Sequence, residues 1–344
     1  MSPPEPAGAA PPVRVLYLAG SGRSGSTLIT TILGQIDGCF AAGEVRYLWQ
    51  RGLLDNRPCG CGAPFGGCPA WSAVLTEVPR PHDPAGIARR LRTRLRMRDL
   101  PALLRRARAG RRAVPAHPDD ATIAAVYRAL ARQAGYAGDG RPPVVVDSSK
   151  LPPYGALLRE LPGIDLRVLH LVRDPRGTAF SWRRRRGLDG VADAKLMSRP
   201  PVWKAALLWR VWNAATVRLF ATAGPDRYLR VRYEDVVADP VRQLRRIAEF
   251  AGLDPDGLAI DDAGRVRLDP THSVAGNPAR HRTGAVPISD DAEWIRALPH
   301  HSYATVTAVA MPLLRRLGYP VRRPPGPPVS SASAAPAPAL TKEG

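Results

Sequence analysis

The chain has 344 residues, 44% of them hydrophobic, and its 50 Lys and Arg residues against 30 Asp and Glu residues give a net charge of +20. This length suits one large α/β domain with insertions or two smaller domains, and we expect the single domain. No apolar run approaches the roughly 20 residues of a membrane span and no signal peptide opens the chain, so we expect a cytoplasmic protein. The charge favours anionic ligands, although only four of the basic residues are lysine.

Both ends of the chain are rich in Ala and Pro, a composition that cannot form a core. We therefore expect residues 1–12 and the tail 321–344 to be disordered. The α/β domain is predicted to span residues 13–320, with an insertion at about 55–135.

The first predicted unit covers residues 13–33, where a β-branched apolar run leads into a Gly/Ser/Arg turn and then into apolar residues at helical spacing. A strand, a glycine loop and a helix N-terminus in this order are typical of a phosphate-binding loop, and an ordinary turn is the alternative. The spacing from Gly20 to Thr27 matches the Walker A motif, but Ser26 stands where that motif has its lysine. The loop is therefore predicted to bind phosphate or sulfate without nucleoside triphosphate chemistry, with Arg23 as a forked donor.

The four cysteines of the chain all lie in one short region, at Cys39, Cys59, Cys61 and Cys68. The last three could bind zinc, but a C-x-C pair followed by six residues and one more cysteine is an irregular spacing for a metal site. We expect a disulfide or packed thiols on this Gly/Pro-rich loop, and no metal.

Residues 87–112 are predicted to form an arginine-rich helix with Ile87, Leu91 and Leu95 on one face, which Pro101 breaks or kinks. A basic lid, a helix at a membrane surface and a solvated helix packed on the domain are equally compatible with this pattern.

Two polar stretches are predicted to reach the ligand-binding edge of the sheet. A segment that begins at Gly43 and Glu44 would return to the edge where the glycine loop lies, which makes Glu44 a candidate carboxylate, with a solvated glutamate as the alternative. The buried strand 144–150 ends in polar residues, where Asp147 could hold Mg²⁺ in an NTPase. Lys150, at the end of the same strand, is either a site residue or an isolated surface charge.

The strand predicted at residues 166–172 runs into an Arg-Asp-Pro-Arg sequence that begins a helix. This order places Arg173 at a strand end, with Ser181 and Arg185 one turn apart on the same helix face. His170, flanked by apolar residues, is predicted to be a core histidine rather than a base.

The remaining pattern continues the alternation of helices and strands. A helix is predicted over 202–220, a strand over 228–235, a helix from Asp239, and an irregular loop over 272–284 that either lies on the surface or closes over an anion. Alternating β and α segments predict an α/β fold of the P-loop type, a parallel sheet flanked by helices, with the basic helical insertion added to a single domain.

Taken in order, these motifs resemble the PAPS-dependent sulfotransferase family, in particular its bacterial, carbohydrate and tyrosylprotein branches. The glycine loop is similar to the family's 5′-phosphosulfate loop, and the segment from Arg173 to Ser181 resembles its 3′-phosphate signature, with Arg185 where tyrosylprotein sulfotransferases have another ligand. The resemblance implies these donor-binding residues: Gly22, Arg23, Ser24, Gly25, Ser26, Thr27, Arg173, Ser181, Arg185, Tyr233, Arg280, Arg282 and Gly284.

The same resemblance implies that PAPS (3′-phosphoadenosine 5′-phosphosulfate) is the co-substrate, without a metal, and that Glu44 is the general base while Lys150 and Arg23 stabilise the transferring sulfuryl group. The acceptor is a hydroxyl or amine of a carbohydrate, a glycolipid, a peptide or a small natural product, and we expect no nucleic-acid partner. Two alternatives stay open: a P-loop kinase or NTPase, and a module that binds nucleic acid or an anionic surface through its arginines.

Overall fold

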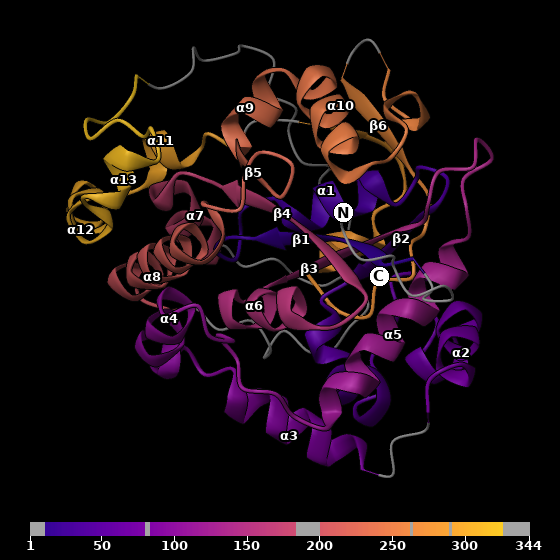
Figure 1. Cartoon of the computed structure of the whole chain (residues 1–344). Helices are drawn as coiled ribbons and strands as arrows, with labels where there is room; N and C mark the ends of the chain where they lie inside the picture. The colour runs from indigo at the N-terminus through magenta and orange to yellow at the C-terminus, as the bar shows by residue number, and fades with distance from the viewer. Residues whose placement is uncertain (1–10, 80–82, 184–199, 262–263, 289–290, 326–344) are drawn as a thin grey trace, which may run out of the picture.

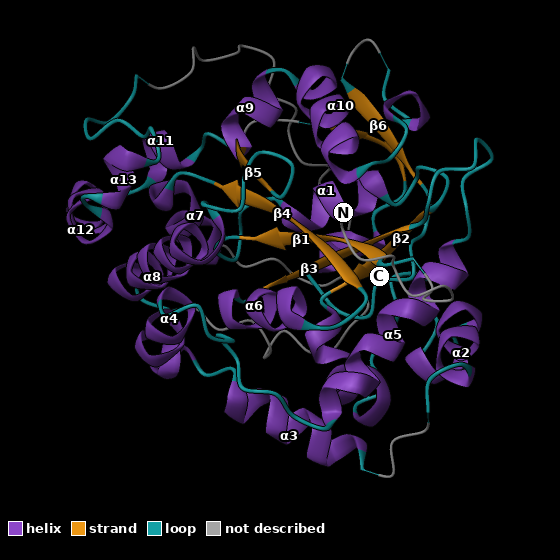
Figure 2. Ribbon diagram, in the orientation of Figure 1, coloured by secondary structure: helices purple, strands orange, loops and turns teal. Residues whose placement is uncertain are grey.

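The computed structural model describes residues 11–79, 83–183, 200–261, 264–288 and 291–325. At its centre, five parallel strands form one sheet in the order β2-β3-β1-β4-β5 (Figures 1 and 2). The strands are β1 (Val13–Ala19), β2 (Cys39–Gly43), β3 (Val144–Lys150), β4 (Ile164–Val172) and β5 (Tyr228–Arg232). The predicted α/β fold, a parallel sheet flanked by helices, is confirmed.

Strand β1 lies in the middle of the sheet, between β3 and β4. Val15 and Tyr17 belong to the core on one face of the sheet, whereas Leu16 and Leu18 belong to the core on the other. Burial on both faces explains why the strand is an almost continuous apolar run. Since the strand order changes direction at β1, the carboxyl ends of β1, β3 and β4 form the crevice in which ligands bind in open α/β sheets.

Helices cover both faces of the sheet (Figure 2). Helices α5, α6 and α8 contribute to the core on one face, and α1 and α10 to the core on the other. The helices are α1 (Ser26–Leu33), α2 (Pro69–Thr76), α3 (Pro84–Arg94), α4 (Leu100–Arg108), α5 (Asp119–Ala134), α6 (Pro152–Glu160), α7 (Pro175–Arg183), α8 (Val202–Phe220), α9 (Tyr233–Ala238), α10 (Pro240–Ala251), α11 (Trp294–Ala297), α12 (His300–Ala310) and α13 (Leu313–Arg316).

The predicted arginine-rich helix is in fact two helices, α3 and α4. Ile87, Leu91 and Leu95 are buried on one face, as predicted. The break lies at residues 95–99, before Pro101, because a proline fits the first turn of the next helix, where its missing N–H costs nothing. In Figure 1, α3 lies beneath α5 and α6, and α4 lies beneath α8.

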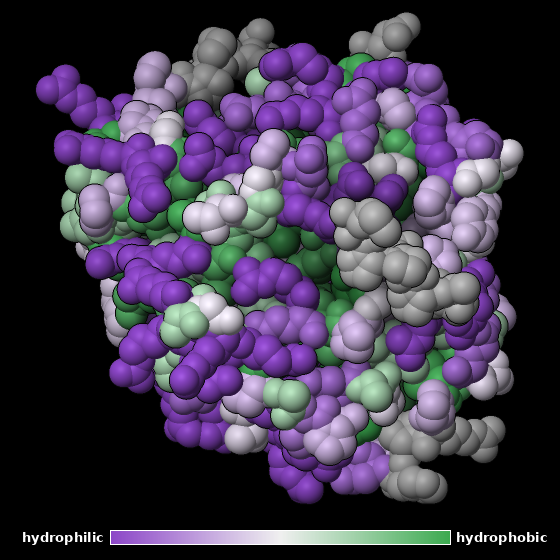
Figure 3. Space-filling view, in the orientation of Figure 1, coloured by the Kyte–Doolittle hydropathy of each residue, from purple (hydrophilic) through white to green (hydrophobic). Residues whose placement is uncertain are grey.

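Part of the positive charge of α3 is paired inside the insertion. Arg90 Nε lies 2.8 Å from Asp119 Oδ2, and Arg94 Nη1 lies 2.9 Å from Asp120 Oδ1. Two ion pairs thus join α3 to the acidic first turn of α5. Arg92, in contrast, is exposed. Figure 3 shows hydrophilic side chains gathered over this lower part of the molecule and again at the top, with hydrophobic surface between them.

The predicted strand 228–235 was too long, since β5 ends at Arg232 and Tyr233 opens α9. Arg232 has extended backbone at the helix N-cap, and Glu234 and Asp235 follow in the first turn, where acidic residues favour a helix. An antiparallel pair, β6 (Arg265–Leu268) and β7 (Gly284–Pro287), flanks the main sheet.

Within the described ranges, every helix is too short or too polar to cross a membrane.

Candidate active site at the carboxyl ends of β1, β3 and β4

The loop between β1 and α1, residues 20–25, has the backbone geometry of an anion-binding loop, and we call it the cradle. Gly20, Arg23 and Gly25 have φ values of 128°, 67° and 91°. A Cβ on Gly20 would lie 2.4 Å from the carbonyl oxygen of Leu171 on β4, so only glycine fits there. Gly25 occupies the N-cap of α1 and offers no side-chain cap, which leaves the first N–H groups of the helix available to an anion. The predicted strand, loop and helix are confirmed.

Two serine hydroxyls in the cradle are buried. Ser21 is 4% exposed and Ser24 is 1% exposed, and neither hydroxyl has a hydrogen-bond partner among the described residues. A buried hydroxyl is normally hydrogen bonded, because leaving it unpaired costs free energy. These two hydroxyls are suited to donate hydrogen bonds to the oxygens of a bound phosphate or sulfate.

Helix α7 closes the cradle on one side through Trp182. The guanidinium carbon of Arg23 lies 5.0 Å from the centre of the Trp182 ring, a cation–π distance. A Cβ on Gly22 would lie 2.8 Å from the same ring. The indole therefore orients Arg23 and requires glycine at position 22.

Arg173, at the carboxyl end of β4, joins the cradle to the second predicted anion site. It is 6% exposed, and its Nη1 donates to the carbonyl oxygen of Arg23 at 3.3 Å. Its guanidinium carbon lies 4.6 Å from the ring centre of Tyr233, and its Nη2 lies 3.0 Å from Asp291 Oδ2. Tyr233 in turn packs against Gly25, where a Cβ would come within 2.6 Å of the tyrosine ring. The structure thus brings together residues that lie 150 and more positions apart.

The helix that carries the other two predicted 3′-phosphate residues is only partly described. Ser181 is buried on α7, which begins directly after Arg173 and Asp174. Arg185 lies outside the described residues.

Glu44 and Lys150 form an ion pair at the ends of β2 and β3. Lys150 Nζ lies 2.8 Å from Glu44 Oε1 and also donates to the carbonyl oxygen of Ser148 at 2.6 Å. Lys150 has a φ of 64° and pairs in register with Ala19, the last residue before the cradle. Burial raises the pKa of Glu44, but the positive charges of Lys150 and Arg46 outweigh it, so the pKa lies below its ordinary value. Glu44 is therefore a carboxylate at neutral pH and can accept a proton.

Asp147 and His170 take no part in this crevice. The Asp147 carboxylate accepts from Tyr127 Oη and, at 2.7 Å, from the Ser149 N–H, and burial raises its pKa to about 6. Both carboxylate oxygens are engaged by the protein, which disfavours the Mg²⁺-binding role considered for this residue. His170 is fully buried between Tyr228 and Asn213, and burial lowers its pKa to about 4, as expected of a core histidine.

The predicted closing loop approaches α1 with its first half. A Cβ on Gly276 would lie 4.0 Å from Thr27 Oγ1 and 3.9 Å from Arg280 Cδ. Burial lowers the pKa of Arg280, and its Nη2 donates to the carbonyl oxygen of Pro58 at 2.6 Å. Arg282 and Gly284 are exposed, and Gly284 pairs with Leu268 in the β6–β7 ladder. The described contacts therefore place Gly276 close to Thr27 of α1, and Arg280 close to Gly276 and Pro58.

A buried polar network behind Arg173 was not predicted. Arg176 is fully buried, and its Nη2 lies 2.5 Å from Asp174 Oδ2. Glu234 accepts from the Asp174 N–H at 2.8 Å and from Tyr319 Oη at 2.9 Å. Asp174 is the N-cap that was predicted for α7, since its Oδ1 accepts from the Arg176 N–H at 2.8 Å. The short Asp-Pro-Arg sequence carried a signal for the cap but none for the burial of the arginine.

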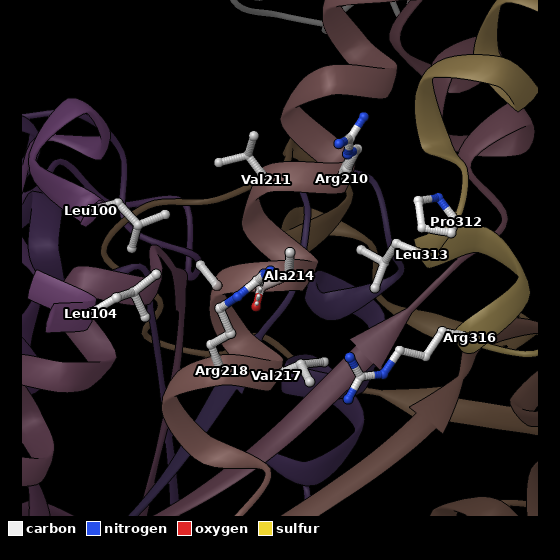
Figure 4. Close-up of a pocket in the computed structure, with 11 residues that line it drawn as sticks. Leu100, Leu104, Arg210, Val211, Ala214, Val217, Arg218, Pro312, Leu313 and Arg316 are labelled. Carbon is white, nitrogen blue, oxygen red and sulfur yellow. Dashed lines mark hydrogen bonds between the residues drawn. The ribbon is translucent and has the colours of Figure 1, made fainter. Parts of the chain in front are cut away.

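A groove of about 440 Å³ lies elsewhere, between α4, α8 and α13 (Figure 4). Its walls are mainly apolar and include Arg210, Arg218 and Arg316. Arg218 bends back to donate to the Ala214 carbonyl oxygen at 3.3 Å. None of the lining residues belongs to the predicted site.

The chain is similar to known sulfotransferases. The sequence profile of the sulfotransferase family matches residues 16–257. Carbohydrate sulfotransferase 3 of Homo sapiens is 26% identical over 187 residues, which cover 48% of this chain and 36% of that protein. Protein-tyrosine sulfotransferase A of Caenorhabditis elegans is 35% identical over 121 residues, covering 33% and 31%. The sulfotransferase domain of the Synechococcus PCC 7002 olefin synthase has a TM-score of 0.51 at 22% identity, covering 90% of this chain and 97% of that domain.

A parallel sheet whose central strand leads into a glycine-rich cradle defines an α/β protein whose loop geometry suits a phosphate or sulfate group. The family profile, which matches well over half of the chain, makes the assignment specific: the chain belongs to the sulfotransferase family. It spans about a third of the length of the two curated relatives.

Proposed function

We propose that this protein transfers the sulfuryl group of PAPS to a hydroxyl or amine of an acceptor, without a metal in the reaction. The observation that carries the proposal is the placement of Arg173. This buried arginine, two residues before α7, contacts both the Arg23 carbonyl and the Tyr233 ring, so its guanidinium lies between the cradle and the start of α9. The cradle would bind the 5′-phosphosulfate, and Arg173 with Ser181 would bind the 3′-phosphate.

The Glu44–Lys150 pair suits the chemistry of in-line sulfuryl transfer. The acceptor oxygen or nitrogen forms a bond to sulfur while the bond from sulfur to the bridging oxygen of the 5′-phosphate breaks, and 3′-phosphoadenosine 5′-phosphate (PAP) leaves. Glu44, ionised at neutral pH, takes the acceptor's proton. Lys150 and Arg23 stabilise the negative charge on the transferring group and on the leaving oxygen. Proton, charge and leaving group then each have a protein partner.

The acceptor class is the open part of the proposal. The curated relatives named above are carbohydrate and protein-tyrosine sulfotransferases, so sugar hydroxyls and tyrosine phenols are the first acceptors to test. Small natural products and glycolipids follow. The exposed arginines of α3 provide an anionic acceptor or a membrane surface with a contact outside the donor site.

Donor recognition is tested by titrating the purified protein with PAP and with ADP, each with and without Mg²⁺. PAP carries a 3′-phosphate that ADP lacks, and two charge-assisted hydrogen bonds to it are worth about 100-fold in Kd. We expect that ratio with or without Mg²⁺, and we expect Arg173→Gln to remove it while the exposed Arg92→Gln keeps it. Equal affinity for the two nucleotides, or binding that requires Mg²⁺, would overturn the proposal in favour of the kinase alternative.

A further inference from the structure

Three cysteines and one histidine outside the reaction site converge on one point. The donor atoms of Cys59, Cys61, Cys68 and His272 all lie within 4.8 Å of one another. Cys61 Sγ and Cys68 Sγ are 3.8 Å apart, and Cys68 Sγ is 3.3 Å from His272 Nδ1. Cys59 and Cys68 are fully buried. The histidine comes from a segment more than 200 positions away in the sequence, which is why the three thiols alone were not expected to bind a metal.

The separations fit a tetrahedral metal rather than a disulfide. With Zn–S bonds of about 2.3 Å and Zn–N bonds of about 2.0–2.1 Å, two sulfurs of a tetrahedron lie about 3.8 Å apart, and a sulfur and a nitrogen about 3.6 Å. A disulfide requires a distance of about 2.05 Å between its sulfurs. The four cysteines are free thiols in the structure. A soft set of three thiolates and one imidazole in this geometry selects zinc among the common divalent ions.

The backbone around the first two cysteines forms a tight turn that holds the thiols in place. The Cys59 N–H donates to the Ala63 carbonyl oxygen at 2.8 Å, and the Gly62 N–H donates to the Cys59 carbonyl oxygen at 2.9 Å. The Gly60 N–H donates to the Ser273 carbonyl oxygen at 2.9 Å, and a Cβ at Gly60 would lie 2.4 Å from the Thr271 carbonyl oxygen. This glycine lets the turn and the histidine segment approach each other.

The histidine is also oriented by its surroundings. The His272 carbonyl oxygen accepts from Trp71 Nε1 at 2.6 Å. The imidazole ring of His272 stacks on the Phe40 ring at a centroid distance of 6.4 Å. These contacts anchor the residue from α2 and β2 while Nδ1 points at the Cys68 thiol. Such outer contacts are the kind that fix the ring orientation of metal-binding histidines.

We propose that Cys59, Cys61, Cys68 and His272 bind one structural zinc ion. Four protein ligands leave no open position, so the ion holds the fold together and does not bind substrate. It links residues 59–68 to residues 272–276. In the second of these segments, the Ala275 carbonyl oxygen accepts from the Glu44 N–H at 3.2 Å. The ion thereby supports the backbone on which the catalytic carboxylate is mounted, and its presence does not depend on the donor or acceptor proposed above.

The experiment measures zinc in the full-length protein, purified without a polyhistidine tag, by elemental mass spectrometry. We expect about one zinc per chain that survives dialysis and is released by denaturation in a chelator. Cys61→Ser and His272→Asn, the two ligands that are not fully buried, should each lower the zinc content and the Tm. Cys39→Ser is the matched control, since this thiol lies outside the cluster, and it should retain the zinc.

Two further measurements keep the proposal falsifiable if the variants do not fold. Wild-type protein produced with Co²⁺ should show the visible absorption and the thiolate-to-cobalt charge-transfer band of tetrahedral thiolate ligation. Thiol titration after denaturation in the presence of a chelator should find all four cysteines reduced. Wild-type protein that contains no zinc, shows no cobalt spectrum or has a disulfide among these cysteines would overturn the proposal.

Discussion

At the scale of single residues, Glu44 is the side chain with the clearest expected effect on chemistry. Glu44→Gln keeps the size of the side chain but cannot accept the acceptor's proton, and a positioned base contributes about 10²–10⁴-fold. We expect kcat to fall by that order while the affinity for PAP is retained. Rates with the true acceptor and PAP titration measure the two quantities.

Glu77→Gln is the matched control for this substitution, because Glu77 is an exposed glutamate whose ion-pair partner is Arg132. It should keep the wild-type rate. A Glu44→Gln enzyme that turns over as fast as the wild type would show that another group is the base.

His170 makes the stability of the fold depend on pH. Burial holds its pKa at about 4, whereas an unfolded chain has a histidine pKa of about 6.5. The stability that neutral His170 contributes is therefore present above about pH 6.5 and is lost as the pH falls towards 4, because the unfolded chain binds the proton first. Between pH 7 and pH 5 this term costs about 2 kcal/mol of the free energy of unfolding.

His170→Gln should remove that pH dependence, since an amide can hydrogen bond to Tyr228 and Asn213 without titrating. Denaturant unfolding at pH 7 and pH 5 measures it as the change in the stability difference between the two proteins. Asp147, whose pKa is raised to about 6, acts in the opposite direction but is present in both proteins and cancels. Parallel pH curves for the two proteins would contradict the assignment.

At the scale of elements, α3 is fixed to α5 by charge as well as by its apolar face. Arg94 is largely buried, pairs with Asp120 and donates to the Pro115 carbonyl oxygen at 2.8 Å. Arg94→Gln should lower the free energy of unfolding by about 1–2 kcal/mol, because it leaves a buried acceptor without its partner. Arg92→Gln, on the exposed face of the same helix, should change it by less than about 0.5 kcal/mol. Thermal unfolding separates the two, and equal effects would show that the ion pair is not structural.

The elements that could be predicted are those whose apolar pattern is strong. β1, β3 and β4 are buried on both faces and therefore appear in the sequence as continuous apolar runs. β2, a short Cys-Phe-Ala-Ala-Gly strand at the edge of the sheet, has no such pattern, and only its last residue was singled out through the glutamate that follows. β5 is shorter than the predicted strand because the hydrophobic alternation of the sequence continues into the first turn of α9.

At the scale of the whole molecule, the site was predictable where its motifs are local and not where it depends on distant contacts. The residues of the cradle are contiguous in the sequence, so the spacing of its glycines was enough to predict an anion-binding loop. The Glu44–Lys150 pair, at 2.8 Å, joins residues at the ends of two strands. Topology made each residue a candidate for this edge of the sheet, but their catalytic roles came only from the family resemblance. The position of His272 beside Cys68 follows from the path of the whole chain, and no sequence spacing indicates it.

The described C-terminal residues extend past the predicted domain end at 320 and contact the network behind the donor site. The Val321 carbonyl oxygen accepts from Tyr303 Oη at 3.2 Å and from Arg176 Nη1 at 3.4 Å. A chain that ends at residue 320 should lose these bonds, unfold at a lower temperature and bind PAP several-fold more weakly. A chain that ends at residue 325 keeps them and should match the full-length protein. Thermal unfolding and calorimetric titration with PAP measure the two quantities for both chains. Unchanged PAP affinity in the shorter chain would contradict the prediction.

Val321 contacts Arg176, which pairs with Asp174 beside Arg173. A loss of PAP affinity on truncation at residue 320 would therefore mean that docking of this segment and donor binding are coupled. Linkage between two sites is reciprocal: if docking of the C-terminal segment tightens donor binding, donor binding must tighten that docking by the same factor. A protease that cuts near Val321 should then work more slowly on the PAP-bound protein than on the free protein. With such coupling, a partner that binds the segment around Val321 would change the affinity for the donor without contacting the cradle.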